Sequence, residues 1–579
     1  MAALHWLYAV SGSFNTAADW TSGLVPGSAD TAILDAAGGA FTVTASSSVT
    51  VSGVETAKNA TLSIGAGTFT ASGGTGAGAS AGTLNIGDGA ALVAGGAIAN
   101  SGFIDVSSTG DVTSLLFSGS KVTLSGGGVV ALSDNGANTL DAQHAGTTLE
   151  NVDNKIKGVG QIGSANLTVI NDAKGIIKAN GALALVLTGA GITNAGAIKD
   201  AINSAMIVSS TTVANAGGLL KAKDGAVLTL QGATIEGGTL STVGSGVIET
   251  SSNGASLDGS ASAVANAGTF LVPDNTSLAL KGTIANSGVL ELAANLGSAA
   301  VSVSNVTLTG AGTVAMSDSS GNAISSASAS TLTNVNDTIS GSGALGSAQL
   351  TLVNDAGGTI DASGSSASLV INTGSNSVTN DGLIEATGTG SAVGKVQSAV
   401  VNNGTLAAAG GTLQLLAAVT GSGSAKISAG ELSFAAAFTQ NVAFTGTSGT
   451  LLLFKSQSYT GTISGFSLTG GTRLDLRDIG FARSNEATFS GNSSGGTLTV
   501  TDGSHTAHIL LAGNYTSSTW VCSADGSGGV IVVDPPASGA GAFAQAMAGL
   551  PAATGVLGQD HLRTSPEAGA PLLALARLP

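Results

Sequence analysis

The sequence predicts an all-β protein: a parallel β-helix or β-solenoid rod with coils of about 20–23 residues and a C-terminal β domain. Three observations predict it: a short motif at nearly constant spacing, a longer internal duplication, and a composition suited to thin sheets and tight turns. Of 579 residues, 88 are Gly and only 3% are aromatic, so small aliphatic side chains must fill the interior. Charged residues make up 9%, against roughly 25% in an ordinary soluble domain.

The short motif is Asn-x-Gly-x-apolar, and neighbouring copies lie 20–22 residues apart. Alternating apolar and polar residues flank it, which indicates strands, while Asn and Gly favour the backbone angles of turns. One coil cannot bury its inward face alone, so we expect stacking. About 19 coils over residues 36–440 would form a rod on the order of 90 Å long.

Asparagine at the same corner of every coil would stack into a hydrogen-bonded ladder of amides. The alternative is that the motif is only turn chemistry, and both alternatives require a solenoid. The expected ladder consists of Asn194, Asn215, Asn266, Asn286, Asn380 and Asn402.

The longer repeat spans about 183 residues within the rod. VTLSGGGVVALSD from Val122 matches VTLTGAGTVAMSD from Val306, and the segment from Thr148 matches the segment from Thr331. Duplication lengthens a rod readily, but it does not readily create a single catalytic cleft.

Both ends differ from the middle. Residues 1–35 hold two of the three tryptophans, and we expect them to form a capping coil, because a solenoid end exposes strand edges and apolar side chains. The stretch SGSFNTAADWTSGLVPGSADTAILD resembles the opening coil of repeat-rich passenger and haemagglutinin-like proteins of Gram-negative bacteria.

Residues 441–536 gather longer strands, aromatic residues and arginine, and form the expected C-terminal β module. Segments such as LDLRDI from Leu474, GTLTVTDG from Gly496 and LAGNY from Leu511 are similar to a C-terminal module of large Gram-negative surface proteins that leave the cell by type I secretion. The resemblance implies a location rather than an activity. Residues 537–579 would be a linker and export tail, or alternatively a frayed tail without a role.

No constellation of residues indicates catalysis or metal binding. The histidines are scattered, and His505 and His508 would face opposite sides of a strand. The first 472 residues contain no Arg, and no Asp-Asp pair occurs. We therefore expect no enzyme, although a polysaccharide lyase or glycoside hydrolase is the alternative on this fold. No cofactor is expected, and the absence of GGxGxDxUx nonapeptides argues against a calcium array.

Lysines form a second pattern, since 7 of the 13 fall between Lys155 and Lys223. The residue about three places after the glycine of each Asn-x-Gly corner should occupy the same place in every coil. Lysines at that place on adjacent coils would stack into a basic stripe. That position holds, in chain order, Asp105, Lys178, Lys199, Lys221, Leu271, Glu291, Asp361, Glu385 and Ala407. The comparison predicts a basic stripe on the first half of the rod that becomes neutral or acidic on the second.

The stripe of Lys178, Lys199 and Lys221 is the candidate ligand-binding site. It would bind an acidic polysaccharide or another cell-surface anion such as lipopolysaccharide phosphate, or the acidic half of a second rod. The alternative is a solvated face on which charge varies freely. A net charge of −16 argues against nucleic acid as a partner.

The sequence thus predicts a secreted or cell-surface structural or adhesive solenoid that binds surfaces or glycans through many weak contacts. The alternatives are a polysaccharide-degrading enzyme and a self-assembling coat or filament protein. The single cysteine, Cys522, excludes an internal disulfide. No Sec signal peptide and no transmembrane helix are expected, and the type I secretion apparatus is the expected export partner.

Overall fold

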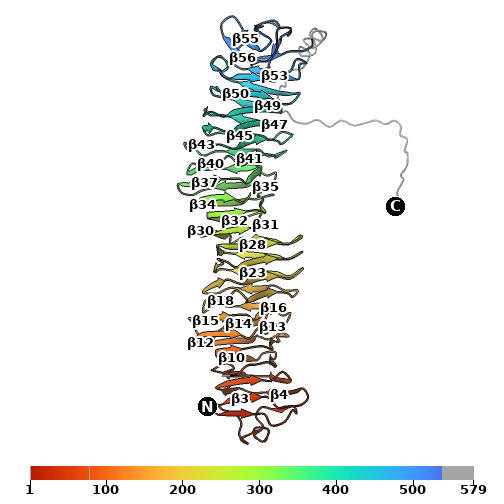
Figure 1. Cartoon of the computed structure of the whole chain (residues 1–579), viewed down its shortest axis with the longest axis vertical. Helices are drawn as coiled ribbons and strands as arrows, with labels where there is room; N and C mark the ends of the chain where they lie inside the picture. Colours follow the sequence, from red (N-terminus) through yellow and green to blue (C-terminus); the bar gives the residue numbers. More distant parts are fainter. Residues whose placement is uncertain (1, 77, 537–579) are drawn as a thin grey trace, which may run out of the picture.

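Strands follow from the alternation of apolar and polar residues. In β4 (Phe41–Ala45) and β18 (Leu167–Asn171), for example, every second side chain is buried. The computed structural model, which describes residues 2–76 and 78–536, winds such strands into a parallel β-solenoid of about 20 coils of about 22 residues, with a C-terminal β region (Figure 1). The fold class predicted from the sequence is confirmed.

Most coils contribute three strands, one to each of three faces of the rod, here named A, B and C. Within a face, each strand pairs in parallel with the matching strands of the adjacent coils. Face A contains β5 (Val49–Val51), β8 (Thr68–Ala71), β14 (Asn138–Ala142), β17 (Gly160–Ile162), β20 (Leu185–Leu187), β23 (Ala205–Ser209), β26 (Val227–Gln231), β29 (Val247–Thr250), β31 (Thr269–Pro273), β33 (Val289–Ala293), β35 (Thr313–Met316), β38 (Thr338–Gly341), β41 (Thr359–Ala362), β44 (Leu383–Ala386), β50 (Asn441–Phe444) and β52 (Thr462–Ser464).

Faces B and C have the same parallel order. Face B contains β1 (Ala3–His5), β3 (Thr31–Leu34), β6 (Gly53–Thr56), β15 (Thr147–Asn151), β18, β21 (Gly191–Asn194), β24 (Thr212–Ala214), β27 (Ala233–Glu236), β36 (Asn322–Ser325), β39 (Gly343–Leu345), β42 (Leu369–Ile371), β45 (Val393–Val396), β51 (Gly449–Leu453) and β53 (Thr472–Leu476). Face C contains β2 (Gly12–Ser13), β4, β7 (Ala60–Ile64), β9 (Thr83–Ile86), β11 (Phe103–Val106), β13 (Val129–Leu132), β16 (Lys155–Gly158), β19 (Ile176–Ala179), β22 (Ala197–Asp200), β25 (Leu219–Ala222), β28 (Gly238–Thr242), β37 (Ser330–Asn334), β40 (Leu350–Asn354), β43 (Val378–Asn380), β46 (Val400–Asn402) and β48 (Val419–Thr420).

Some longer strands bend around a corner and belong to two faces. Faces A and B share β10 (Ala91–Ala99), β12 (Thr113–Ser125), β47 (Thr405–Leu415) and β49 (Ser424–Phe434), and faces B and C share β30 (Ala255–Asn266), β32 (Thr276–Asn286) and β34 (Ala299–Thr309). Two short 3-10 helices, η1 (Ala17–Asp19) and η2 (Ser456–Ser458), lie near the ends of the rod.

Aromatic side chains close the first coil. Trp6, Phe14 and Trp20 are buried, with ring centroids 5.1 Å apart for the two tryptophans and 5.0 Å apart for Phe14 and Trp20. Phe14 also contacts Phe69, with centroids 5.4 Å apart. This cluster covers the apolar interior at the N-terminal end of the rod.

Antiparallel strands close the other end. The parallel coils continue past residue 440 through β53, which pairs with β58 (Val530–Val533). The remaining strands are β54 (Ala487–Asn492), β55 (Gly495–Thr501), β56 (Thr506–Ala512) and β57 (Val521–Ala524), all with antiparallel neighbours. Trp520 packs against Phe466 and Tyr515, with centroids 5.7 and 5.9 Å away. The expected export tail, residues 537–579, lies outside the described residues.

The internal duplication is offset around the rod. Val122 pairs with Leu149 on face B, whereas its counterpart Val306 pairs with Leu332 on face C. The repeat of about 183 residues is not a whole number of coils of about 22 residues. The second copy is therefore turned by one face relative to the first.

Candidate anion-binding surface on face C

Lysines gather on four consecutive coils of face C. Strands β16, β19, β22 and β25 have the sequences KIKG, IIKA, AIKD and LLKA. In each of them the residue before the third-position lysine is a buried Ile or Leu. Because side chains alternate along a strand, burying that residue directs the lysine outward.

These lysines are directly opposed. Lys157 pairs with Lys178, Lys178 with Lys199, and Lys199 with Lys221. We call these four residues the basic column. The structure thus brings together the three lysines predicted from the sequence and adds Lys157, which the comparison at the corner glycine did not include. The 21-residue step from Lys157 to Lys178 is the signal that could have found it.

The basic column has no acidic partner among residues 2–76 and 78–536, since none of its four lysines forms an ion pair there. Burial lowers the pKa of Lys178, and the charges of Lys223, Lys155 and Lys157 lower it further. The pKa of Lys199 is lowered in the same way, first by burial and then by its lysine neighbours. The neighbouring lysines therefore disfavour the charges of Lys178 and Lys199, and a bound anion would relieve that repulsion.

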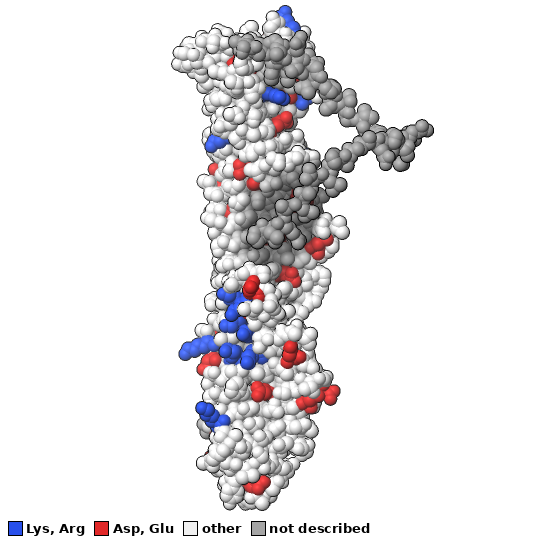
Figure 2. Space-filling model, turned by 90° about the vertical axis from the view of Figure 1, so that its right-hand side faces the viewer, with Lys and Arg blue, Asp and Glu red and all other residues white. Residues whose placement is uncertain are grey.

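The remaining lysines of this region enlarge the positive surface. Lys155, Lys174 and Lys223 are exposed and flank the basic column. Figure 2 shows a dense group of Lys side chains just below the middle of the rod, with several separate Asp or Glu side chains nearby on a mostly uncharged surface. At one end of the column, Asp105 lies two coils before Lys157 on the same face. Burial raises the pKa of the Asp105 carboxyl, and the charge of Lys157 partly offsets that rise.

The acidic residues predicted to continue the stripe lie on a different face. Glu291 is on β33, Asp361 on β41 and Glu385 on β44, all on face A. The expectation of one stripe that changes sign along the rod is therefore wrong. Because the second copy of the duplication is turned by one face, two residues at the same distance from their Asn-x-Gly corners can lie on different faces of the rod.

The asparagines also occupy two corners rather than one. Asn194 and Asn215 lie between faces B and C, where amide Nδ2 atoms donate to amide Oδ1 atoms of the next coil from Asn151 through Asn171 and Asn194 to Asn215, at 2.7–2.8 Å. Asn266 and Asn286 lie between faces C and A and are bonded at 2.8 Å. On that second corner a further series runs from Asn334 through Asn354, Asn380 and Asn402 to Gln440.

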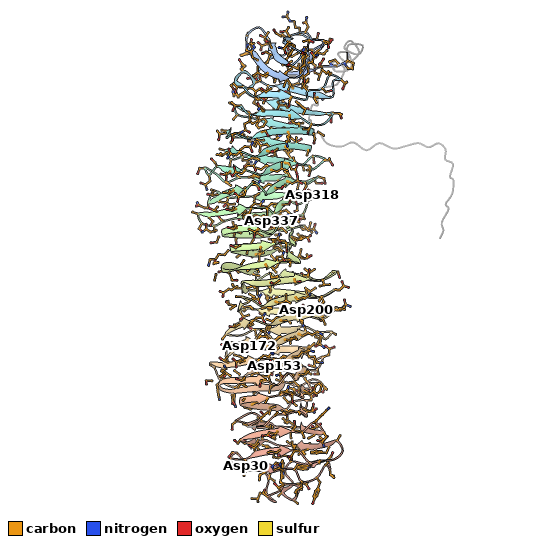
Figure 3. All side chains as sticks on the ribbon, viewed as in Figure 1. Asp30, Asp153, Asp172, Asp200, Asp318 and Asp337 are labelled. Atoms are coloured by element: carbon orange, nitrogen blue, oxygen red, sulfur yellow. The ribbon has the colours of Figure 1, made fainter. Side chains whose placement is uncertain are left out.

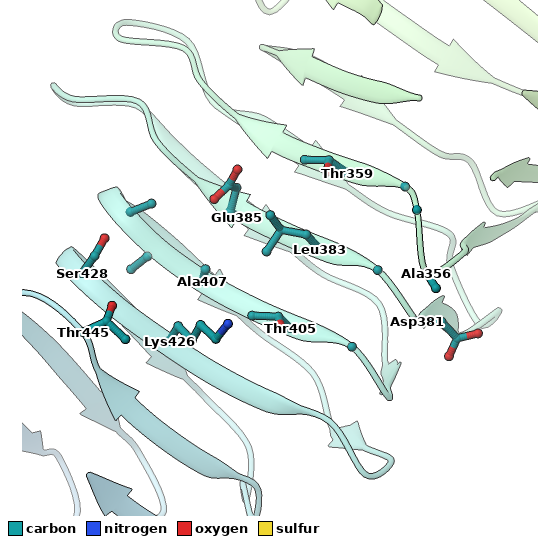
Figure 4. A pocket seen from close by; sticks show the side chains of 16 residues that line it. Ala356, Thr359, Asp381, Leu383, Glu385, Thr405, Ala407, Lys426, Ser428 and Thr445 are labelled. Atoms are coloured by element: carbon teal, nitrogen blue, oxygen red, sulfur yellow. The ribbon is translucent and has the colours of Figure 1, made fainter. Parts of the chain in front are cut away.

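A groove of about 480 Å³ crosses face A (Figure 4). Its floor contains Gly404 and Ala407, small residues between the coil that carries Glu385 and the coil that carries Lys426. Glu385 pairs directly with Asp361; burial raises the pKa of both carboxyls, and the Asp361 charge raises that of Glu385 further. The groove itself is lined by Asp381, Glu385 and Lys426, a combination that sequence reasoning did not connect, although it did place Asp361 and Glu385 in one series.

A buried carboxyl also escaped the sequence analysis. Asp200 follows Lys199 and therefore points inward, where it is 0% exposed and neither of its oxygens has a hydrogen-bond partner among the described residues. Figure 3 labels its position along the rod. Burial raises the pKa of this carboxyl from 3.8 to about 8. Its inward position follows from strand alternation in AIKD, which is the signal that could have found it.

The described part of the chain holds no group of three or more His, Cys, Asp or Glu side chains arranged to bind a metal ion. Of the two histidines considered above, His508 lies within hydrogen-bond distance of Thr499, and His505 of Asp502. Over the same residues, no helix is long and apolar enough to cross a membrane.

These features define a rod with a charge-dense strip on one face and a mixed groove on another. Comparison with known proteins adds no relative: no family model, no curated protein and no solved structure matches this chain.

Proposed function

We propose that this protein is an extracellular or cell-surface adhesive rod that binds an acidic polysaccharide along face C. The observation that carries the proposal is the basic column: four lysines at directly paired positions, without an acidic partner in the described structure. A ligand that carries regularly spaced negative charges would neutralise them together.

The spacing of the column favours an extended polymer over a small anion. Adjacent coils of a parallel solenoid lie about 4.8 Å apart, which is close to the length of one sugar residue in an extended chain. A polyuronate chain that lies parallel to the rod axis would therefore carry about one carboxylate per coil, and the carboxylates on its protein-facing side would contact the column. Contacts of this kind are individually weak and solvent-screened, and they gain strength by acting together on one ligand.

The extracellular location is part of the proposal and is supported by the sequence resemblances at both ends of the chain. A long repetitive rod also suits a surface role. The type I secretion apparatus is the proposed export partner.

The first test is binding to polygalacturonate at low salt, measured by affinity electrophoresis and calorimetry. The triple variant Lys178→Ala, Lys199→Ala, Lys221→Ala is expected to bind at least about tenfold more weakly than the wild type. Binding of the wild type should weaken as salt is added, because the interacting charges are exposed. Unchanged binding of the triple variant would refute the proposal.

A matched control removes the same charge elsewhere. Lys58, Lys395 and Lys455 lie outside the basic column, and replacing all three with alanine is expected to leave binding within about twofold of the wild type. The column variant is expected to be at least as stable as the wild type, because opposed like charges destabilise strand pairs. Loss of binding with retained stability would therefore identify a ligand site rather than a folding defect.

A second candidate function is polysaccharide cleavage, and the paired carboxyls of Asp361 and Glu385 beside the face A groove favour it. Their raised pKa values suit proton transfer more than those of ordinary surface carboxyls do. The same binding experiment should therefore include an assay for newly formed reducing ends. Cleavage that is lost in Glu385→Gln would support this second function over adhesion alone.

A further inference from the structure

A second groove, of about 530 Å³, lies at the corner between faces B and C in the second half of the rod. Four consecutive coils contribute to it, each near the start of its face C strand. The coils are those of β34, β37, β40 and β43. Because these coils are stacked, the groove runs parallel to the rod axis over roughly 14 Å, about three sugar residues.

The lining of this groove is polar but uncharged. Its side chains are hydroxyls, carboxamides and methyl groups, from Asn305, Ala329, Ser330, Thr331, Ala348, Gln349, Thr351, Ser375 and Asn376. A charged ligand would lose part of its hydration there without meeting an opposite charge. The lining therefore selects a neutral ligand that offers both donors and acceptors.

Several of these polar groups are free to bind a ligand. Within the described structure, the side chains of Thr331, Gln349 and Thr351 form no hydrogen bond to the protein, whereas Asn305 accepts a bond of 3.1 Å from the Thr331 backbone N–H. Thr331 and Thr351 are directly paired, so their hydroxyls repeat at the coil spacing. The groove thus presents a short row of unused hydroxyl and amide groups.

The duplication shows that this surface differs between the two copies. In the first copy, Lys121 stands at the position of Asn305 and Glu150 at that of Thr333, and the two form an ion pair of 2.9 Å. In the second copy both charges are replaced by neutral polar residues. The uncharged groove is therefore a property of one copy and not of the repeat.

We propose that this groove binds a straight, neutral polysaccharide chain through its hydroxyl groups. A peptide strand is a poorer occupant, because the coil backbones are already paired on both sides and no sheet edge is free at this corner. The methyl groups of Ala329 and Ala348 would contact the C–H surfaces of the sugar rings. This proposal does not depend on the basic column, which lies in the other half of the rod.

The test uses the full chain and three β-1,4-linked probes, cellohexaose, mannohexaose and xylohexaose, with calorimetry as the readout. The wild type is expected to bind at least one of them. Thr351→Lys places a long charged side chain in the middle of the groove, and Gln349→Ala removes an exposed amide. Both variants are expected to weaken binding, the first by about tenfold or more.

The matched control is Thr168→Lys, because Thr168 is the counterpart of Thr351 in the first copy and also faces solvent. It should bind the probe within about twofold of the wild type. Failure of all three hexasaccharides to bind the wild type, or equal binding by Thr351→Lys, would overturn the proposal. Polygalacturonate binding should persist in Thr351→Lys, so the two proposals fail or succeed separately.

Discussion

Replacing Asp200 with alanine is expected to stabilise the rod, and the gain should increase with pH. The carboxyl is 0% exposed and its oxygens have no hydrogen-bond partner among the described residues. Ala179, its direct partner in the preceding coil, is also fully buried, and so is Ala222, which follows Lys221 as Asp200 follows Lys199. Alanine therefore suits this position, and Ala386 occupies the matching place in the second copy.

The pH dependence follows from the direction of the pKa shift. Burial raises the pKa of Asp200 from 3.8 to about 8, so the folded chain binds more protons than the unfolded chain between these values. Stability from this group is therefore fully present below about pH 4 and is lost as the pH rises toward 8. The loss is on the order of 6 kcal/mol once the pH exceeds 8, given about 1.4 kcal/mol for each unit of pKa difference.

The measurement is chemical unfolding followed by circular dichroism at pH 5, 7 and 9. The difference in the free energy of unfolding between Asp200→Ala and the wild type isolates this carboxyl from the others. Asp200→Asn is the matched control, since it removes the charge but keeps a buried polar group, and its stability relative to Asp200→Ala should not change with pH. A difference between the alanine variant and the wild type that is constant with pH would contradict the assignment.

The fold could be predicted from the sequence because its determinants are local. Alternation fixes which side chains face inward, and the step of about 22 residues fixes the coil. The coil length also predicted the stacking of Lys178, Lys199 and Lys221, because these residues lie 21 and 22 residues apart on adjacent coils.

Features that depend on the accumulated turn of the rod could not be predicted in this way. Asn215 and Asn266 have the same local motif but lie at different corners, because the coils between them move the motif from the end of a face B strand to the end of a face C strand. The spacing between two neighbouring motifs gives the length of one coil, but it does not show how far the motif has moved around the rod over many coils. The two grooves also could not be predicted from the sequence, since each depends on small or uncharged residues from several coils.

Replacing Asn380 with alanine is expected to destabilise the second half of the rod by about 2–4 kcal/mol. Asn380 is 0% exposed; its Oδ1 accepts from Asn354 at 2.8 Å and its Nδ2 donates to Asn402 at 2.7 Å. Alanine removes both bonds, which leaves the Oδ1 atom of Asn402 buried without this donor. The effect is this large because buried polar groups lose a partner and stay desolvated, which costs more than the net contribution of one hydrogen bond to stability.

Asn253→Ala is the control, because this asparagine is exposed and its side chain forms no hydrogen bond in the described structure. Its unfolding free energy should stay within about 0.5 kcal/mol of the wild type. Hydrogen exchange should show that Asn380→Ala loses protection first in β40, β43 and β46, the coils that the amide series connects. A variant as stable as Asn253→Ala would mean that the motif acts only through its turn. Because each amide both accepts from one coil and donates to the next, a stabilising role requires that loss of one member weakens both neighbouring contacts.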